Sequence, residues 1–176
     1  GGKLVEITLG GLRTSAAKAT QTVSFHGNLS SAQSEHTVSD VTVIDDVGAK
    51  HALTVVFKKG TSATAAEWDV VVKEGDKTLG SGKLPFADGR IKDGGQQLRF
   101  AYKPHGAGET PVVLDFGADV SSFATDTFSS IAMSKQDGYA PGSLTKVSFD
   151  EGGALKLSYS NGHNEKGVQL ALSRFE

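Results

Sequence analysis

The segment 137–162 reads DGYAPGSLTKVSFDEGGALKLSYSNG. Apolar and polar residues alternate in two runs, the first through Val147 and Phe149 and the second over 155–159. A period of two is that of a β-strand with one buried face. The Asp-Glu-Gly-Gly between the runs and the closing Asn-Gly are turn sequences, and Asn-Gly is a strong signal for a β-hairpin. The segment therefore predicts antiparallel strands joined by tight turns, with a third strand over 168–172.

The same alternation recurs through the rest of the chain. It predicts strands at Val23–Phe25, Val41–Val43, His51–Phe57, Trp68–Val72, Leu98–Tyr102 and Val112–Phe116. Helical periodicity is scarce. The best candidate, 121–135, is rich in Ser and Thr and has irregular apolar spacing, which favours an extended or looping connection. We predict an all-β chain of ten to twelve strands, mostly antiparallel, with a domain boundary near residues 130–138.

Length and composition exclude several classes of protein. The chain has 176 residues, enough for one ordinary domain or two small ones. Its 18 Lys and Arg residues nearly balance 20 Asp and Glu residues, so no basic excess is present to bind nucleic acid or an anionic membrane. Cysteine is absent, which excludes disulfides, thiolate catalysis and Cys-ligated metals. No apolar run approaches the ~20 residues of a membrane-spanning helix. Because the chain begins with Gly-Gly and not with Met, we expect it to be an excised part of a longer protein or to carry the remnant of a tag.

Residues that often carry chemistry are present, but not in chemical patterns. The five histidines, none at metal-site spacing, are His26, His36, His51, His105 and His163. The carboxylate pairs Asp45-Asp46 and Asp150-Glu151 both fall in predicted hairpin turns, where Asp is favoured for the geometry of the turn. We interpret them as turn residues and not as acid–base or calcium groups. The sequence thus predicts no catalytic residue, no metal ligand and no cofactor.

Three further motifs have the same structural interpretation. The stretch Gly80–Leu84 resembles part of a phosphate loop, but Lys77 stands where the first glycine should be and no helix follows, so we predict a turn. The tripeptide Asn28–Ser30 matches the glycosylation sequon, a match that arises often by chance. Trp68 is the only tryptophan and alternates with valines, which favours a core position over a sugar-stacking one.

Together with VQLALSRF at 168–175, the opening segment resembles the bacterial flagellar hook protein. The family pattern is carried by Gly138, Tyr139, Gly142, Leu144, Thr145, Asp150, Tyr159, Ser160, Asn161, Gly162 and Phe175. Upstream, 22–31 resembles the step that opens the hook's outer domain, and 41–59 resembles a hook hairpin. The charged HNEKGVQ at 163–169 departs from the family pattern. We define the family motif as Gly138, Tyr139, Gly142, Leu144, Tyr159, Asn161 and Gly162.

This resemblance implies a structural role. Hook subunits are exported unfolded and polymerise helically into a short curved tube outside the cell that transmits motor torque to the filament. The resemblance implies an outer β-barrel or sandwich at 20–130, inserted in an inner β-domain formed by 1–19 and 131–176, with paired crossings of the chain between them. It implies as partners other copies of the chain and the neighbouring rod, junction and hook-cap proteins. Each interface is expected to be weak, so the isolated chain is expected to be monomeric.

Two alternatives to a hook subunit stay open on the sequence. Flagellar rod proteins share the Tyr-Ser-Asn-Gly signature, so the chain is also compatible with a rod-type axial protein. A carbohydrate-binding or adhesin-type β-sandwich would need two or three aromatic side chains exposed on one face. An enzyme is the least supported class, because the carboxylates and histidines are not gathered by any motif.

Overall fold

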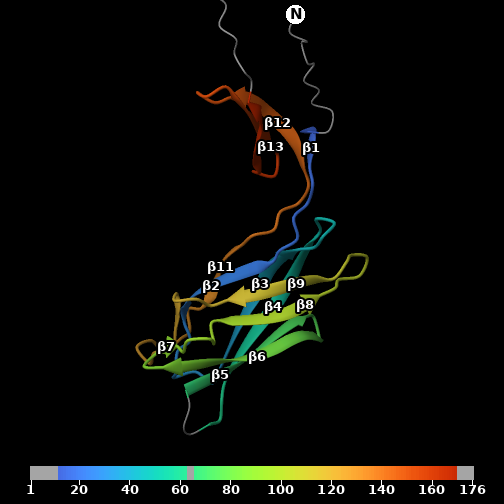
Figure 1. The fold of residues 1–176 in the computed structure, drawn as a ribbon. Helices are drawn as coiled ribbons and strands as arrows, with labels where there is room; N and C mark the ends of the chain where they lie inside the picture. Colours follow the sequence, from blue (N-terminus) through green and yellow to red (C-terminus); the bar gives the residue numbers. More distant parts are fainter. Residues whose placement is uncertain (1–11, 63–65, 170–176) are drawn as a thin grey trace, which may run out of the picture. The chain divides into compact units, whose positions relative to one another are not determined.

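The computed structural model describes residues 12–62 and 66–169 and contains no α-helix in them (Figure 1). Fourteen strands lie in the described residues, and their pairs are mostly antiparallel, with the pairs β2–β9 and β2–β10 parallel, so the prediction of a mostly antiparallel all-β chain is confirmed. The predicted number of strands was too low, because three of the fourteen have only two residues and show no alternation. The chain divides into two compact units, Lys18–Gly138 and Gly1–Ala17 with Tyr139–Glu176.

The larger unit holds ten of the strands. They are β2 (Thr22–Asn28), β3 (Glu35–Ile44), β4 (Lys50–Lys59), β5 (Ala66–Glu74), β6 (Lys77–Ala87), β7 (Arg90–Ile91), β8 (Gln97–Tyr102), β9 (Thr110–Asp115), β10 (Val120–Ser121) and β11 (Ala132–Gln136). The pairing order is β3-β4-β5-β6-β7-β10-β2-β9-β8, with β11 also paired to β2. The first part of β2 lies between β9 and β11, and its end pairs with β10. Strand β2 therefore joins a layer of β11, β2, β9 and β8 to a layer running from β3 to β10.

The core of this unit lies between the two layers. Every residue on the predicted apolar faces of its strands is buried, with the exception of His51, which is half-buried. The phenyl rings of Phe25 and Phe116 stack at 5.0 Å, and Phe57 meets Phe116 edge-on at 5.9 Å. Aromatic pairs of this kind add to the stabilisation that area burial provides. These rings come from β2, β4 and the residue that follows β9, so they hold the two layers together.

The predicted turn at Gly80–Leu84 was wrong, because the stretch lies inside strand β6. Its two glycines face strand β8 of the other layer. A Cβ added at Gly80 would lie 2.7 Å from Cβ of Phe100, and one added at Gly82 would lie 2.5 Å from Cδ1 of Leu98. Both distances are shorter than van der Waals contact. The glycines are therefore needed for the close approach of the two layers and not for a change of chain direction.

Two hairpin turns share one hydrogen-bonding pattern, as the sequence predicted for their carboxylates. In the β3–β4 turn, Oδ1 of Asp45 accepts from the amides of Val47 (3.0 Å) and Ala49 (2.8 Å). In the smaller unit, Oδ1 of Asp150 accepts from the amides of Gly152 (2.9 Å) and Ala154 (2.8 Å). In both turns the glycine just before the alanine has a positive φ, 90° in the first and 75° in the second. The prediction that the carboxylates shape the turns is confirmed for Asp45 and Asp150, whereas Asp46 accepts from the amide of Gly108 in another loop.

The smaller unit is a four-stranded antiparallel sheet in the order β1-β12-β13-β14. Its strands are β1 (Thr14–Ser15), β12 (Gly142–Phe149), β13 (Ala154–Tyr159) and β14 (Asn164–Gln169). Leu155, Leu157 and Tyr159 are buried, whereas Val147 and Phe149, paired with Leu157 and Leu155, are 41% and 57% exposed. The predicted third strand is present but begins at Asn164, and the part of it after residue 169 lies outside the described residues.

The larger unit ends at Gly138, within the predicted boundary region of residues 130–138 and eight residues beyond the end of the outer domain that the resemblance implied. Strand β11 pairs with β2, with Met133 opposite Phe25, and the unit ends at Gly138. Alternation in β11 is interrupted by a bulge between Met133 and Lys135, which hides this strand in the sequence. Within the described residues, no helix has the length and apolarity needed to cross a membrane.

Candidate functional site

The family motif is divided between the two units. Gly138 is the last residue of the larger unit, and the other six residues lie in the smaller one. Those six are Tyr139, Gly142, Leu144, Tyr159, Asn161 and Gly162. Within each unit, the motif residues make hydrogen bonds and close contacts to backbone atoms of neighbouring segments.

Gly138 lies where the chain enters and leaves the larger unit. An added Cβ would lie 2.5 Å from Oγ1 of Thr20, 2.7 Å from the amide nitrogen of Thr20 and 2.9 Å from the carbonyl oxygen of Lys18. The amide of Gly138 donates to Oε1 of Gln136 (2.7 Å), and the same oxygen accepts from the hydroxyl of Thr20. The hydroxyl of Thr20 also accepts from the amide of Ile44 (2.8 Å). The entering and leaving segments are therefore in direct contact and locked to the sheet.

Asp137 strengthens the same crossing. Its Oδ1 accepts from the amides of Gln21 (2.8 Å) and Thr22 (3.0 Å), and its other oxygen lies 3.6 Å from Nζ of Lys18. Burial raises the pKa of Asp137, but the two amides and the Lys18 charge lower it more, so it lies below its ordinary value. The carboxylate thus stays charged while it joins residues on the two crossing segments.

Substitution of Gly138 by Val tests this crossing. The added side chain meets two backbone atoms that cannot rotate away, so we expect the free energy of unfolding of the larger unit to fall by about 2 kcal/mol. The measurement is urea denaturation followed by the fluorescence of Trp68, which lies in this unit. Gly94→Ala is the control: no atom lies within 4 Å of a Cβ there, and its positive φ of 86° should cost about 1 kcal/mol of strain without any overlap. Equal effects of the two substitutions would contradict the role of Gly138 in close packing.

In the smaller unit, Asn161 connects the β13–β14 turn to the segment before β12. Its Nδ2 donates to the carbonyl oxygen of Ala140 (2.9 Å), and its Oδ1 accepts from the amide of His163 (3.0 Å). A Cβ on Gly142 would lie 2.6 Å from the side-chain carbon Cγ of Asn161. Gly162 has φ +83° and donates to the carbonyl oxygen of Tyr159 (3.0 Å). Each polar or glycine residue of the motif in this unit is therefore used to close the turn or to admit Asn161.

The motif tyrosines lie against one histidine. The ring of Tyr139 stacks on His163 at 4.9 Å and 22°, and the ring of Tyr159 lies 6.2 Å from the same imidazole. Nε2 of His163 is 3.3 Å from Oε1 of Glu165. His163 therefore packs directly against two residues of the family motif. It belongs to the charged stretch 163–169, which departs from the family pattern. The sequence had not connected this histidine with the motif.

One cluster of ionisable groups lies in the larger unit. Nε2 of His51 is 2.7 Å from Oδ2 of Asp45, which is buried, and its Nδ1 is 3.5 Å from Oε1 of Glu74. The hydroxyl of Tyr102 donates to Glu74 (2.7 Å). The cluster joins the β3–β4 turn to the ends of β5 and β8. A nucleophile-activating site needs a Ser, Thr or Lys hydrogen-bonded to the histidine, and among the described residues none is bonded to His51. The Asp45–His51 pair therefore lacks the nucleophile of such a site.

The charges in this cluster are held by hydrogen bonds. Burial raises the pKa of Asp45, but hydrogen bonds from His51 and the amides of Ala49 and Val47 lower it more, so the pKa lies below its ordinary value. Burial, followed by the hydrogen bond to Glu74, raises the pKa of Tyr102. The arrangement keeps the buried Asp45 carboxylate charged and hydrogen-bonded, so that it holds the β3–β4 turn against His51.

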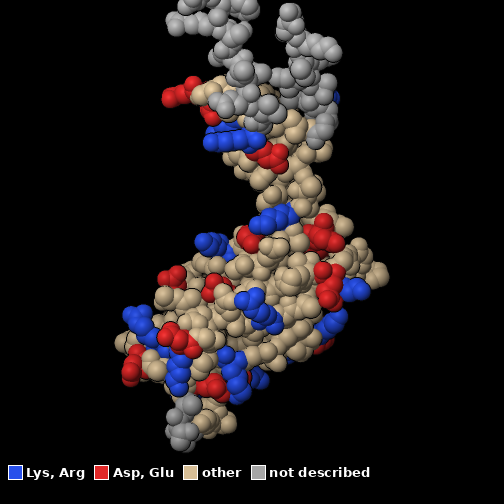
Figure 2. Space-filling model, in the orientation of Figure 1, with Lys and Arg blue, Asp and Glu red and all other residues tan. Residues whose placement is uncertain are grey.

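The other candidates have structural positions. The five histidines do not converge, and no group of three His, Asp or Glu side chains in the described residues is able to hold a metal ion. Trp68 is buried and its indole N–H donates to Oγ of Ser122 (3.0 Å), so its predicted core position is confirmed. The Asn28 side chain accepts from the amide of Phe123 (2.8 Å). Figure 2 shows positive and negative side chains interspersed over the face in view.

Comparisons with known proteins agree with the resemblance. No protein-family model matches the chain. The flagellar hook protein FlgE of two Helicobacter pylori strains is 30% identical over 187 residues, covering 91% of this chain and 25% of the relative. The crystal structure of the H. pylori flagellar hook protein FlgE2 matches with a TM-score of 0.50 and 17% identity, over 75% of this chain and 31% of that one.

This chain spans about a quarter of the length of the curated FlgE relatives. At 17% identity the solved structure speaks for the fold alone. The predicted resemblance of this chain to the bacterial flagellar hook protein is confirmed, in sequence by FlgE and in fold by FlgE2.

Proposed function

We propose that this chain is the β-domain portion of a structural subunit of the bacterial flagellar hook. The observation that carries the proposal is the similarity to FlgE, which runs along 91% of the chain and is not confined to one motif. The positions of the motif residues also support this proposal. The motif glycines and Asn161 hold the turns and the chain segments that enter and leave the larger unit, and such rigidity is what a force-bearing part requires. The role is mechanical, and no chemical step is assigned to any residue.

The two units correspond in this proposal to two domains of the subunit. The outer domain, predicted at 20–130, is assigned to the unit 18–138. The inner domain, predicted at 1–19 and 131–176, is assigned to 1–17 and 139–176. The fastening of Thr20 to Gln136 and Gly138 supports this assignment, because both chain crossings of an inserted domain must transmit force together.

The proposed partners are other copies of the same protein in a helical polymer. Rod, junction and hook-cap proteins are its proposed neighbours at the ends of the tube, which lies outside the cell. A rod-type axial protein is the second candidate, favoured only by the shared Tyr-Ser-Asn-Gly signature. Trp68, the main candidate for stacking on a sugar, is buried, so it does not support a sugar-binding role.

Deletion of 18–138 from the parent gene tests the proposal. With a short Gly-Ser linker in place of the unit, we expect hooks of altered shape and a loss of swimming, because the outer contacts between subunits are removed. Electron microscopy of isolated hooks and swimming-plate assays are the measurements. Cells that regain the native segment on a plasmid are the control. Hooks of normal shape together with normal swimming would overturn the assignment.

A further inference from the structure

The loop between β10 and β11 presents an aromatic side chain to solvent on a fixed backbone. Phe128 is 74% exposed, the highest value among the large apolar side chains of the described residues. The loop is tied to the segment after β2. The amide of Ser129 donates to Gln33 (2.6 Å), the amide of Ser30 donates to Oγ of Ser129 (2.9 Å), and the hydroxyl of Ser30 donates to the carbonyl oxygen of Asp126. The Phe128 ring is therefore exposed to solvent on a loop whose backbone is already ordered, so binding through this ring costs little conformational entropy.

The other end of the same loop is fastened equally well. The side chain of Asn28 both accepts from the amide of Phe123 (2.8 Å) and donates to its carbonyl oxygen (3.1 Å). The ring of Phe123 covers the turn before β7, where a Cβ on Gly89 would lie 1.9 Å from it. Phe123 is thus used within the unit, whereas Phe128 has no such use. Aromatic residues, Phe among them, are enriched in protein interfaces relative to the rest of the surface.

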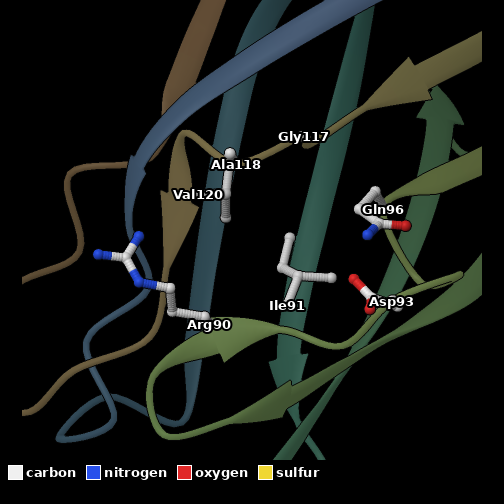
Figure 3. A pocket seen from close by; sticks show the side chains of 7 residues that line it. All are labelled: Arg90, Ile91, Asp93, Gln96, Gly117, Ala118 and Val120. Carbon is white, nitrogen blue, oxygen red and sulfur yellow. The ribbon is translucent and has the colours of Figure 1, made fainter.

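The same unit carries a hollow that a phenyl ring would fit. It measures about 380 Å³ and is lined by Arg90, Ile91, Asp93, Gln96, Gly117, Ala118 and Val120. A cavity of about 150 Å³ already holds a benzene ring. Figure 3 shows Ile91 pointing into the space below Ala118 and Val120, with Arg90 at one end and Asp93 at the other. The centre is apolar and the ends are charged.

We propose that Phe128 of one copy of this chain inserts into the Arg90–Val120 hollow of another copy. The charges favour this pairing: the loop tip carries the Asp126 carboxylate, and the mouth of the hollow carries the Arg90 guanidinium. Neither group has a hydrogen-bond or ion-pair partner in the described residues. A ring entering near Arg90 also gains a cation–π contact. The Phe128 loop and the hollow are built from different residues of one chain, so the contact between copies is of the head-to-tail kind and can repeat from copy to copy.

This inference rests on the proposed function, because a polymer of identical subunits is what brings the Phe128 loop and the hollow of the same protein together repeatedly. Its test does not require hooks. The chain has no cysteine, so single cysteines can report the contact without a background. Thr127→Cys places a thiol next to the intact Phe128 ring, and Asp93→Cys places one at the hollow.

The experiment mixes the purified Thr127→Cys chain with the ¹⁵N-labelled Asp93→Cys chain at millimolar concentration under diamide. Mass spectrometry then identifies the mixed disulfide by its label. We expect the mixed product to form, and adding Phe128→Ala to the first copy to reduce its rate of formation about thirty-fold, the effect of truncating an interface anchor. Val47→Cys in place of Thr127→Cys is the control, since Val47 is 60% exposed in the same unit.

Equal rates for Thr127→Cys and Val47→Cys, or no effect of Phe128→Ala, would overturn the contact. The two proposals fail separately. If the mixed disulfide does not exceed the control while deletion of 18–138 still alters hooks, the hook role stands and the contact is wrong. If the disulfide forms as expected but the deletion leaves hooks unchanged, the contact stands and the hook role is wrong.

Discussion

Gly27→Val is expected to lower the free energy of unfolding of the larger unit by about 4 kcal/mol. Gly27 has φ +110°, a backbone conformation closed to a β-branched residue. An added Cβ would also lie 2.5 Å from the carbonyl oxygen of Ser130 and 2.9 Å from Cα of Ile131. Both are backbone atoms, so no side chain can rotate to make room. Strain and overlap therefore act together at this position.

The position explains the size of the effect. Gly27 lies opposite Val120, where β2 leaves its pairing with β11 and begins to pair with β10. Its amide donates to the carbonyl oxygen of Asp119 (2.9 Å). A shift of the backbone at Gly27 would thus disturb both layers of the unit at once.

Urea denaturation monitored by the fluorescence of Trp68 measures this loss. Gly75→Ala is the matched control: Gly75 has φ +59°, but no atom lies within 4 Å of an added Cβ. Strain without overlap should cost about 1 kcal/mol there. If Gly27→Val cost no more than Gly75→Ala, overlap with the loop before β11 would not be important and the described packing of β2 would be wrong.

Asp45→Ala is expected to cost about 3 kcal/mol at pH 7. The substitution removes the acceptor for two amides, Val47 and Ala49, and the carboxylate partner of His51. Because Asp45 is buried, water cannot replace all three hydrogen bonds. Asp46→Ala is the matched control, since Asp46 is exposed and accepts only from the amide of Gly108 (3.0 Å), and it should cost less than 1 kcal/mol.

The pH dependence follows from the direction of the pKa shift. The pKa of Asp45 is lower in the folded state than its ordinary value of about 3.9, so the unfolded chain binds the proton more readily. The charged carboxylate therefore contributes stability above about pH 4, and this contribution is lost as the pH falls through the folded-state pKa. The difference in unfolding free energy between the native chain and Asp45→Ala should shrink as the pH falls below about 4. A difference that grew on acidification would contradict the shift.

The strands that the sequence predicted well are those with one buried face and uninterrupted alternation. Strand β4 is an example: His51, Leu53, Val55 and Phe57 do share a face, and the Asp45 turn before them has the expected geometry. Strand β11 was missed as part of the larger unit, because its bulge breaks the period and its partner β2 is 106 or more residues away. The glycines of β6 were misread for a similar reason: the residues that require them belong to another strand.

The candidate site divides along the same line. The motif residues were identifiable from a resemblance, and the turn role of Asp150 and Gly162 from local chemistry, since a turn is built from neighbouring residues. The Asp45–His51–Glu74–Tyr102 cluster, the stacking of Tyr139 on His163 and the exposure of Phe128 carried no local signal. Phe128 has the same residue type as the buried Phe57, and only its surroundings distinguish the two.

The sequence by itself therefore determined the secondary structure class, the buried faces of the long strands of the larger unit and the positions of the Asp45 and Asp150 turns, because period and turn chemistry act within a few residues. Only the tertiary structure decided which glycines admit a neighbouring layer, where the larger unit ends and which aromatic ring is left for a partner. Those features depend on segments that are far apart in the chain, and the approach of such segments is set by packing in three dimensions.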